Sequence, residues 1–440
     1  MTTDVSQFID AEQGEIQGEI FHSPDIYEQE LQRVWARSWV FLAHDSMIPN
    51  KGDFVQSYIG EDPVVVVRQR DGSVRAFLNQ CRHRGMRICR ADRGNAKAFM
   101  CSFHGWAYDT AGNLIQVPHE ETAYSPETFD KKDWGPRQVA QIDQYRGFWF
   151  ATWDPEAPSL RDYLGDMAWY FDAHFDRYDA GYEAIAVHKW VIQANWKLNA
   201  EQPSADMYHG DVTHVSAKQV MGIGPTKERK GHQFSATFGH GTGWWDVGGN
   251  TRRESVGDVW LAEHRDEVVR RVGERRADGI RGHANVFPNF MFLHNGTIRV
   301  THPRGPGELE IWAWTMVPKD APAPMKEEIR KKVLRTFSPG GLFEQDDAEN
   351  WVEEQRIMRG YIARRSPLVY QMRLGDARRD QNGLPGVTVD HPYADEGSRG
   401  MYRHWEDMMV SDSWAEVIER KRRRGEPVTA RSLAHEGVGR

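Results

Sequence analysis

Two short motifs, each pairing a cysteine with a histidine, constrain the fold of this 440-residue chain more than any other feature. Cys81 and His83 form the first motif, and Cys101 and His104 form the second, with seventeen residues between His83 and Cys101. The chain holds only 3 cysteines and 18 histidines, so two such pairs are far from a chance expectation. Because thiolate and imidazole are both good metal ligands, the pairing predicts a metal centre held by two loops.

Two thiolates and two imidazoles suit either a tetrahedral zinc ion or a Rieske-type [2Fe–2S] cluster, in which histidines replace cysteines on one iron. The short spacing within each motif favours the cluster, because each loop then supplies one ligand to each iron. Cys89 lies outside both motifs. We expect it to be a small buried side chain rather than a ligand.

Composition and charge exclude several classes of protein. The net charge of −8 argues against a general nucleic-acid binder. The longest aliphatic run, Val64–Val67, is far too short for a membrane span. Few cysteines, and an N-terminus without a basic stretch or an apolar core, predict a protein without a signal peptide that works in the cytoplasm.

The periodicity of apolar residues changes along the chain. Short β-branched and aromatic segments predict a small antiparallel unit before a junction at residues 154–158. The stretch 221–257 carries nine glycines and predicts a mobile loop or hairpin region rather than core. The basic run 420–424 is expected to be a solvated helix end. Apolar spacing and capping residues predict helices at 24–37, 196–209, 325–337, 342–364 and 401–423.

A second group of candidate metal ligands follows the junction. His209 and His214 are five residues apart, which rotates them by about 140° on an ideal helix, so both can face one ion only if the helix breaks between them. Asp206 and His209 share a helix face. A third ligand would complete a 2-His-1-carboxylate site for Fe(II). The acidic helix start at 344–347 offers carboxylates, which also suit an ordinary helix N-terminus.

The sequences around both groups resemble those of one enzyme family. The stretches CRHRG, CSFHGWAY, NWKLNAEQPSADMYHGDVTH and GGLFEQDDAENW are similar to motifs of the α subunit of Rieske non-heme iron aromatic-ring-hydroxylating dioxygenases, such as the naphthalene, biphenyl and toluene enzymes. The resemblance implies that His209, His214 and Asp347 bind the mononuclear iron. It implies that Asp206 bridges the two metal centres. It implies that four residues bind the [2Fe–2S] cluster: Cys81, His83, Cys101 and His104.

The resemblance also implies the architecture and the reaction. The expected fold is α+β, with a small antiparallel β Rieske domain at 38–158 inserted in a larger α+β catalytic domain formed by 1–37 and 159–440, whose central antiparallel sheet is flanked by helices. Electrons from NADH are expected to pass through a separate reductase and a ferredoxin to the cluster. Both atoms of O2 then add to an aromatic ring, giving a cis-dihydrodiol. An α3 or α3β3 assembly with a small β subunit is expected, with no nucleic-acid or membrane partner.

The substrate pocket is expected to be apolar. Gln202 and Pro203 stand where the family usually has Asn and an aromatic residue, so the substrate preference of relatives does not transfer directly. Gly210 and Pro203 replace bulkier side chains of some relatives, which predicts a roomier cavity and favours a bicyclic or polycyclic hydrocarbon. His294 and Arg299 leave open an aromatic carboxylate, of the phthalate or salicylate type. Rieske monooxygenation is a second alternative, because the same iron site can perform both reactions. The resemblance places seven residues in the pocket: Gln202, Pro203, Met207, Gly210, Leu293, Phe337 and Phe343.

Overall fold

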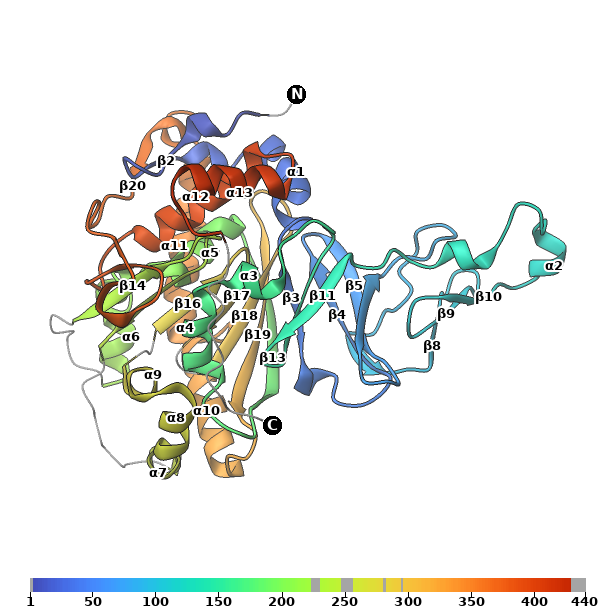
Figure 1. Cartoon of the computed structure of the whole chain (residues 1–440), viewed down its shortest axis with the longest axis horizontal. Coiled ribbons are helices and arrows are strands. Elements are labelled where there is room, and N and C mark those ends of the chain that lie inside the picture. The colour runs from blue at the N-terminus through green and yellow to red at the C-terminus, as the bar shows by residue number, and fades with distance from the viewer. Residues whose placement is uncertain (1–2, 223–229, 247–255, 280–281, 294–295, 429–440) are drawn as a thin grey trace. The chain divides into compact units, whose positions relative to one another are not determined.

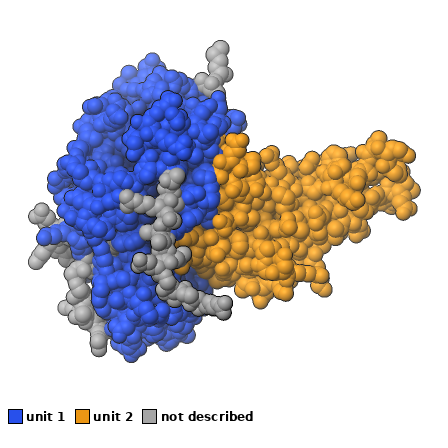
Figure 2. All heavy atoms as spheres, in the orientation of Figure 1, with its two compact units in different colours: residues 1–34, 158–440 blue, residues 35–157 orange. Residues whose placement is uncertain are grey.

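In the computed structural model, which describes residues 3–222, 230–246, 256–279, 282–293 and 296–428, the chain leaves one structural unit, builds a second and returns to the first. The first unit joins residues 1–34 to residues 158–440, and the second comprises residues 35–157 (Figure 2). The second unit is built on small antiparallel sheets, whereas the first combines a large antiparallel sheet with helices. The predicted α+β class with an inserted β unit is therefore confirmed.

The inserted unit consists of short strands in three small sheets (Figure 1). Its first and last strands pair with each other, since β12 lies between β11 and β3. The small antiparallel unit that β-branched and aromatic segments predict in this part of the chain is present. The strands of the unit are β3 (Val40–His44), β4 (Asp53–Ile59), β5 (Asp62–Arg68), β6 (Val74–Leu78), β7 (Arg93–Asn95), β8 (Ala98–Met100), β9 (Ala107–Asp109), β10 (Leu114–Gln116), β11 (Gln141–Tyr145) and β12 (Phe148–Thr152).

The larger unit is organised by a nine-stranded antiparallel sheet in the order β13-β19-β18-β17-β16-β15-β14-β22-β21. Six consecutive strands, β14 to β19, are neighbours in chain order, so the centre of the sheet is a meander. The strands are β13 (Tyr182–Ile192), β14 (Gly231–Ser235), β15 (Gly241–Trp245), β16 (Gly282–Val286), β17 (Phe290–Leu293), β18 (Thr297–Pro303), β19 (Leu309–Pro318), β21 (Arg378–Arg379) and β22 (Val387–Val389).

Helices cover both faces of this sheet. Asn285 of β16 donates to Ser204 of α5 on one face. On the opposite face, Phe292 of β17 packs on Phe171 and Phe175 of α4. None of the helices among the described residues has the length and apolarity needed to cross a bilayer. The main helices are α1 (Pro24–Glu30), α3 (Leu160–Leu164), α4 (Met167–Phe175), α5 (Trp196–Ala205), α6 (Val215–Val220), α7 (Val256–Glu263), α8 (Arg265–Val272), α9 (Glu274–Asp278), α10 (Ala323–Thr336), α11 (Leu342–Met358), α12 (Glu396–Val410) and α13 (Trp414–Arg423).

The described part of the glycine-rich stretch contains a hairpin, one of the two predicted alternatives, but this hairpin belongs to the core. It consists of β14 and β15, which are central strands of the sheet, and both are largely buried. A Cβ at Gly241 would lie 2.3 Å from the carbonyl oxygen of Ser204, and one at Gly243 would lie 2.9 Å from that of Ala205. The glycines are needed because α5 lies directly against β15, not because the segment is a loop.

The expected helix 401–423 is two helices, α12 and α13, with a break at residues 411–413. The basic run at the end of α13 is not simply solvated, because Lys421 and Arg424 both bind the buried carboxylate of Asp407. Asp407 therefore fastens the last described helix to α12.

The N-terminal segment is fixed to the larger unit by Glu30, the last residue of α1. Its carboxylate is fully buried and lies 2.5 Å from Nζ of Lys197. The indole N–H groups of Trp196 and Trp405 each donate to it at 2.8 Å. One carboxylate thus joins α1 to the first turn of α5 and to α12.

We predict that Glu30→Gln lowers the free energy of unfolding by about 3 to 5 kcal/mol, because it leaves the Lys197 ammonium buried without its counter-charge. The matched double variant Glu30→Gln/Lys197→Met removes both charges and should recover much of this loss. Denaturant unfolding of the three proteins measures the difference. Equal losses in the single and double variants would contradict a charge-based explanation.

Candidate metal centres and substrate pocket

The two cysteine–histidine loops of the inserted unit have the same backbone construction. In the first loop, the N–H of Cys81 donates to Met86 and that of Gly85 donates back to Cys81. The second loop repeats both bonds, from Cys101 to Trp106 and from Gly105 to Cys101. Both glycines have a left-handed backbone, with φ of 78° and 74°, which explains the residue type at these positions.

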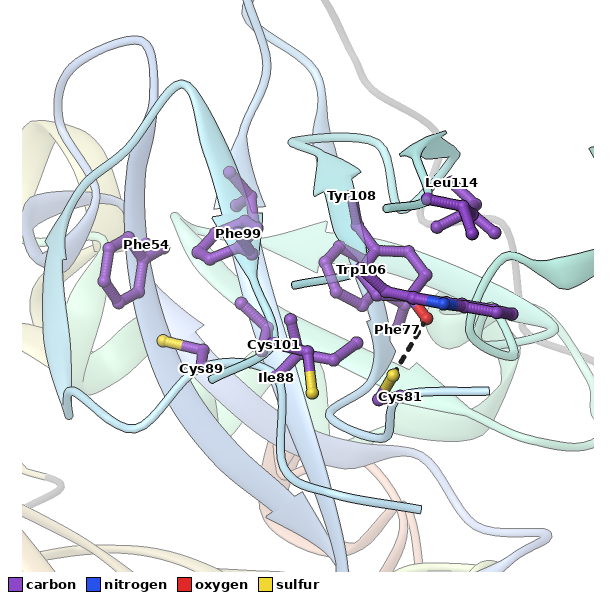
Figure 3. Close-up of a cluster of buried hydrophobic side chains, with 13 residues drawn as sticks. Phe54, Phe77, Cys81, Ile88, Cys89, Phe99, Cys101, Trp106, Tyr108 and Leu114 are labelled. Carbon is purple, nitrogen blue, oxygen red and sulfur yellow. Dashed lines mark hydrogen bonds between the residues drawn. The ribbon is translucent and has the colours of Figure 1, made fainter. Parts of the chain in front are cut away.

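The side chains of these loops converge in a way that fits a [2Fe–2S] cluster. The sulfurs of Cys81 and Cys101 are buried in the cluster of apolar side chains shown in Figure 3, and the rings of His83 and His104 lie 4.4 Å apart. Nδ1 of His83 is buried and has no hydrogen-bond partner among the described residues, as expected of an atom meant for a metal. Two buried thiols and two adjacent imidazoles are the donor set of a Rieske cluster.

Other residues complete this site. The hydroxyl of Tyr108 lies 3.3 Å from Sγ of Cys81 (Figure 3) and accepts a hydrogen bond from the N–H of Arg82. Cys89 is turned toward its own loop, where its thiol lies 3.5 Å from the carbonyl oxygen of Ala91. The sequence reading did not find the role of Tyr108, although it lies within the second motif.

The two candidate iron histidines lie just beyond α5, where the helix is interrupted. The helix ends at Ala205 rather than at His209, and a short 3₁₀ turn, His209–Asp211, separates the two histidines before α6 begins. The expected break is thus present. It lets the two imidazole rings face each other with centroids 5.2 Å apart and an interplanar angle of 81°.

The third candidate ligand comes from α11. Oδ1 of Asp347 lies 3.6 Å from Nε2 of His209 and 3.3 Å from Nε2 of His214. This oxygen is buried and accepts no hydrogen bond from any described residue. Three donor atoms within 4.8 Å of one another, two nitrogens and one oxygen, suit one octahedral ion with open positions.

Burial and neighbouring charges shift the pKa values of the three candidate ligands in different directions. Burial disfavours a charged His209, but the hydrogen bond and charge of Asp206 outweigh it and raise the pKa of His209 to about 9. Burial, together with the charge of His209, lowers the pKa of His214 to about 4. Burial raises the pKa of Asp347 to about 7, against the opposing charge of His209. Because the three groups are buried close together, their pKa values depart from the ordinary ones.

Each imidazole is also oriented by a second carboxylate. Oδ2 of Asp206 lies 3.1 Å from Nδ1 of His209, and Oδ2 of Asp346 lies 3.1 Å from Nδ1 of His214. A carboxylate at Nδ1 fixes the tautomer that presents Nε2 to a metal. Asp346 looked like an ordinary helix N-terminus residue in the sequence, and its role becomes visible only in the fold.

Comparisons with known proteins agree with this geometry. Residues 160–411 match the family "Ring hydroxylating alpha subunit (catalytic domain)", and residues 38–139 match the Rieske [2Fe-2S] domain. The chain belongs to the ring-hydroxylating α-subunit family. It is 46% identical to the biphenyl 2,3-dioxygenase α subunit of Rhodococcus jostii strain RHA1, over 94% of this chain and 92% of the relative. It is 45% identical to the benzene 1,2-dioxygenase α subunit of Pseudomonas putida, over 94% and 95%.

Solved structures give the same result. Naphthalene 1,2-dioxygenase with indole bound in its active site matches with a TM-score of 0.88 and 32% identity, covering 95% of this chain and 97% of that one. The α subunit is therefore an oxidoreductase of the ring-hydroxylating dioxygenase type that carries a Rieske cluster and a mononuclear iron. It is one part of a system with partner subunits and electron-transfer proteins, through which NADH supplies the electrons.

The structure brings part of the expected pocket next to the iron site of the α subunit. The ring of Phe343 lies 4.6 Å from that of His214, and Phe337 follows at 5.6 Å from Phe343. The amide of Gln202 lies 3.3 Å from Nε2 of His209 and accepts a hydrogen bond from the indole of Trp351.

The remaining expected pocket residues are more dispersed. Met207 lies over β15, and a side chain at Gly210 would make ordinary contact with Trp245. Pro203 is buried inside α5. Leu293 ends β17 and lines a cavity of about 250 Å³ beside α7 and α10. These four residues lie on or near α5, the 3₁₀ turn and the sheet, and their place in the substrate pocket stays a prediction.

The two cationic candidates have different outcomes. His294 lies outside the described residues. Arg299 is buried and lies 2.7 Å from Glu344, so its charge is already compensated. The aromatic-carboxylate alternative is therefore not favoured.

The sequence reading also missed a group of acids behind Asp206. Glu201 accepts hydrogen bonds from the hydroxyls of Tyr370 and Tyr402, and with Asp206 and Glu354 it lines a cavity of about 400 Å³ that reaches His209. Burial raises the pKa of Glu201 to about 8, and the charge of Glu354 adds to this rise.

We predict that this proton makes stability depend on pH. The folded protein keeps a proton on Glu201 that the unfolded chain releases near its ordinary pKa of 4.5. Stability from this group is thus fully present below pH 4.5 and is lost as the pH rises through about 8, at no more than about 1.4 kcal/mol per pH unit. In Glu201→Gln this loss should be absent. Thermal unfolding midpoints of both proteins from pH 5 to 8 measure it, and parallel curves would refute the assignment.

Proposed function

We propose that this α subunit is the terminal oxygenase that adds both atoms of O2 to an uncharged bicyclic or larger aromatic hydrocarbon, giving a cis-dihydrodiol. The observation that carries the proposal is the convergence of His209, His214 and Asp347 beside the aromatic wall of Phe343 and Phe337. The curated relatives act on biphenyl, benzene and naphthalene, which supports an apolar aromatic substrate.

We propose that His209, His214 and Asp347 are the iron ligands. The iron they hold supplies the oxygen chemistry when it is bound. Asp206 and Asp346 would keep the two imidazoles in the ligating tautomer, and the carboxylate of Asp347 would be the third ligand. The rings of Phe343 and Phe337 exclude water from that side of the site and give a flat substrate a surface to pack on.

We further propose that Cys81, His83, Cys101 and His104 bind the cluster, that the Rieske domain spans 38–158, and that 1–37 with 159–440 form the catalytic domain. The division of the chain near residues 35 and 158 supports these bounds. A small β subunit, a ferredoxin and a reductase would complete a cytoplasmic α3β3 system.

Electrons would reach the iron from a second copy of the chain, through His104 of the partner subunit, Asp206 and His209. Two observations support this route. Asp206 contacts His209, and its side chain is 36% exposed. A carboxylate between two metal-bound imidazoles can accept an N–H from each and so connect the two centres.

We predict that Asp206→Ala, compared with the wild type at equal iron content, loses about a hundredfold in turnover, because the connection between the centres is removed. Asp346→Ala is the matched control, since it removes the equivalent carboxylate of the other histidine and should weaken iron binding in the same way, but keep normal cluster reoxidation at equal iron content. Iron content, the spectrum of the reduced cluster and the rate of cluster reoxidation with substrate present separate the two effects. Near-normal reoxidation in Asp206→Ala would exclude the proposed route.

Incorporation of labelled oxygen tests the reaction itself. With reductase and ferredoxin supplied, naphthalene and biphenyl should give diols in which both hydroxyl oxygens come from 18O2. A parallel reaction in labelled water should leave the product unlabelled. A product with one labelled atom would instead establish monooxygenation.

A further inference from the structure

A buried ion pair joins the sheet to the helix that carries Asp347. Nη2 of Arg299, in β18, lies 2.7 Å from Oε2 of Glu344, in α11, and the two side chains are 3% and 2% exposed. Burying two charges costs about as much desolvation free energy as their attraction returns, so such a pair contributes little net stability. The position of the pair therefore calls for another explanation.

The pair lies at the end of a row of rings that begins at the iron site. Phe343 contacts His214, Phe337 contacts Phe343, and the guanidinium carbon of Arg299 is 5.6 Å from the centre of the Phe337 ring. Arg299 pairs with Met291 in the sheet register, which places it on the same face as Leu293. Arg299 thus lies next to Phe337, the second of the two rings that form the aromatic wall of the proposed pocket.

Arg299 retains unused capacity for an anion. Its Nε is buried and has no hydrogen-bond partner among the described residues. Glu344 is the only carboxylate within ion-pair distance of Arg299 in the described part of the chain. If Glu344 lost its charge, the guanidinium would be a buried cation that favours any anion able to reach it.

We propose that Glu344 is a specificity-determining residue: by holding Arg299, it reserves the pocket for uncharged aromatic rings and excludes aromatic carboxylates. The inference rests on the proposed function for the location of the substrate. Substrate choice then depends on Glu344, the partner of the cation, rather than on the cation Arg299 itself.

The test compares 2-naphthoate with 2-naphthamide, two molecules of nearly the same shape that differ in charge. Calorimetric binding to the purified oxygenase at pH 7.5 needs no turnover. The wild-type protein should prefer the amide. Glu344→Gln should bind 2-naphthoate more tightly by about tenfold to a hundredfold, the range for one charge-assisted hydrogen bond, with little change for the amide. No gain for 2-naphthoate would overturn the proposal.

The double variant Arg299→Gln/Glu344→Gln is the matched control. It has neither charge and should continue to reject 2-naphthoate, whereas a gain equal to that of Glu344→Gln would also overturn the proposal. If Glu344→Gln fails to fold, Glu344→Asp keeps the charge but loosens the contact, and it should show a smaller gain; an unchanged affinity contradicts the idea. If dihydrodiol formation is absent while the charge-dependent binding holds, the proposed reaction fails and the role of Glu344 stands. If no variant binds either naphthalene derivative, both the proposed reaction and the role of Glu344 are contradicted.

Discussion

The buried carboxylate of Glu30 is the interaction on which the rest of the catalytic unit depends. Its donors, Trp196, Lys197 and Trp405, come from the start of α5 and from α12, so a single group fixes three segments that are distant in sequence. The position of α5 decides where the chain emerges toward His209. An error at the start of this ten-residue helix would displace the candidate iron ligands, where about 1 Å matters.

Carboxylates also organise the far end of α5, in a different way. At Glu30 the negative charge is matched by a buried ammonium, whereas at the iron site Asp206, Asp346 and Asp347 face only two imidazoles. Burial raises the pKa of Asp347 to about 7, whereas the contacts with His209 hold the pKa of Asp206 below its ordinary value. The buried carboxylate of Asp347 is thus the group whose charged form a bound cation would favour.

The sequence was most informative where chemistry limits the choice of residue. The spacing of the two cysteine–histidine motifs and the need for a helix end near His209 could be predicted from the residues, and the inserted β unit from the resemblance to the family. It failed where a residue serves a neighbour that is distant in sequence. Gly241 and Gly243 resemble loop residues until α5 is placed against them. Asp346 resembles a helix N-terminus residue until His214 is placed beside it.

The insertion of residues 35–157 into the catalytic unit raises a physical problem, because Glu30 must find α5 across more than 150 residues. The inserted unit resolves it by pairing its own first and last strands. Phe41 of β3 lies opposite Phe150 of β12, and His44 lies opposite Phe148. Neighbouring strands are about 4.8 Å apart, so the chain enters and leaves the unit at nearly the same place. For the catalytic unit, the insert then acts as a closed loop, and the entropy of bringing Glu30 to Lys197 is that of the residues outside it, 31–39 and 152–196, rather than of the whole intervening sequence.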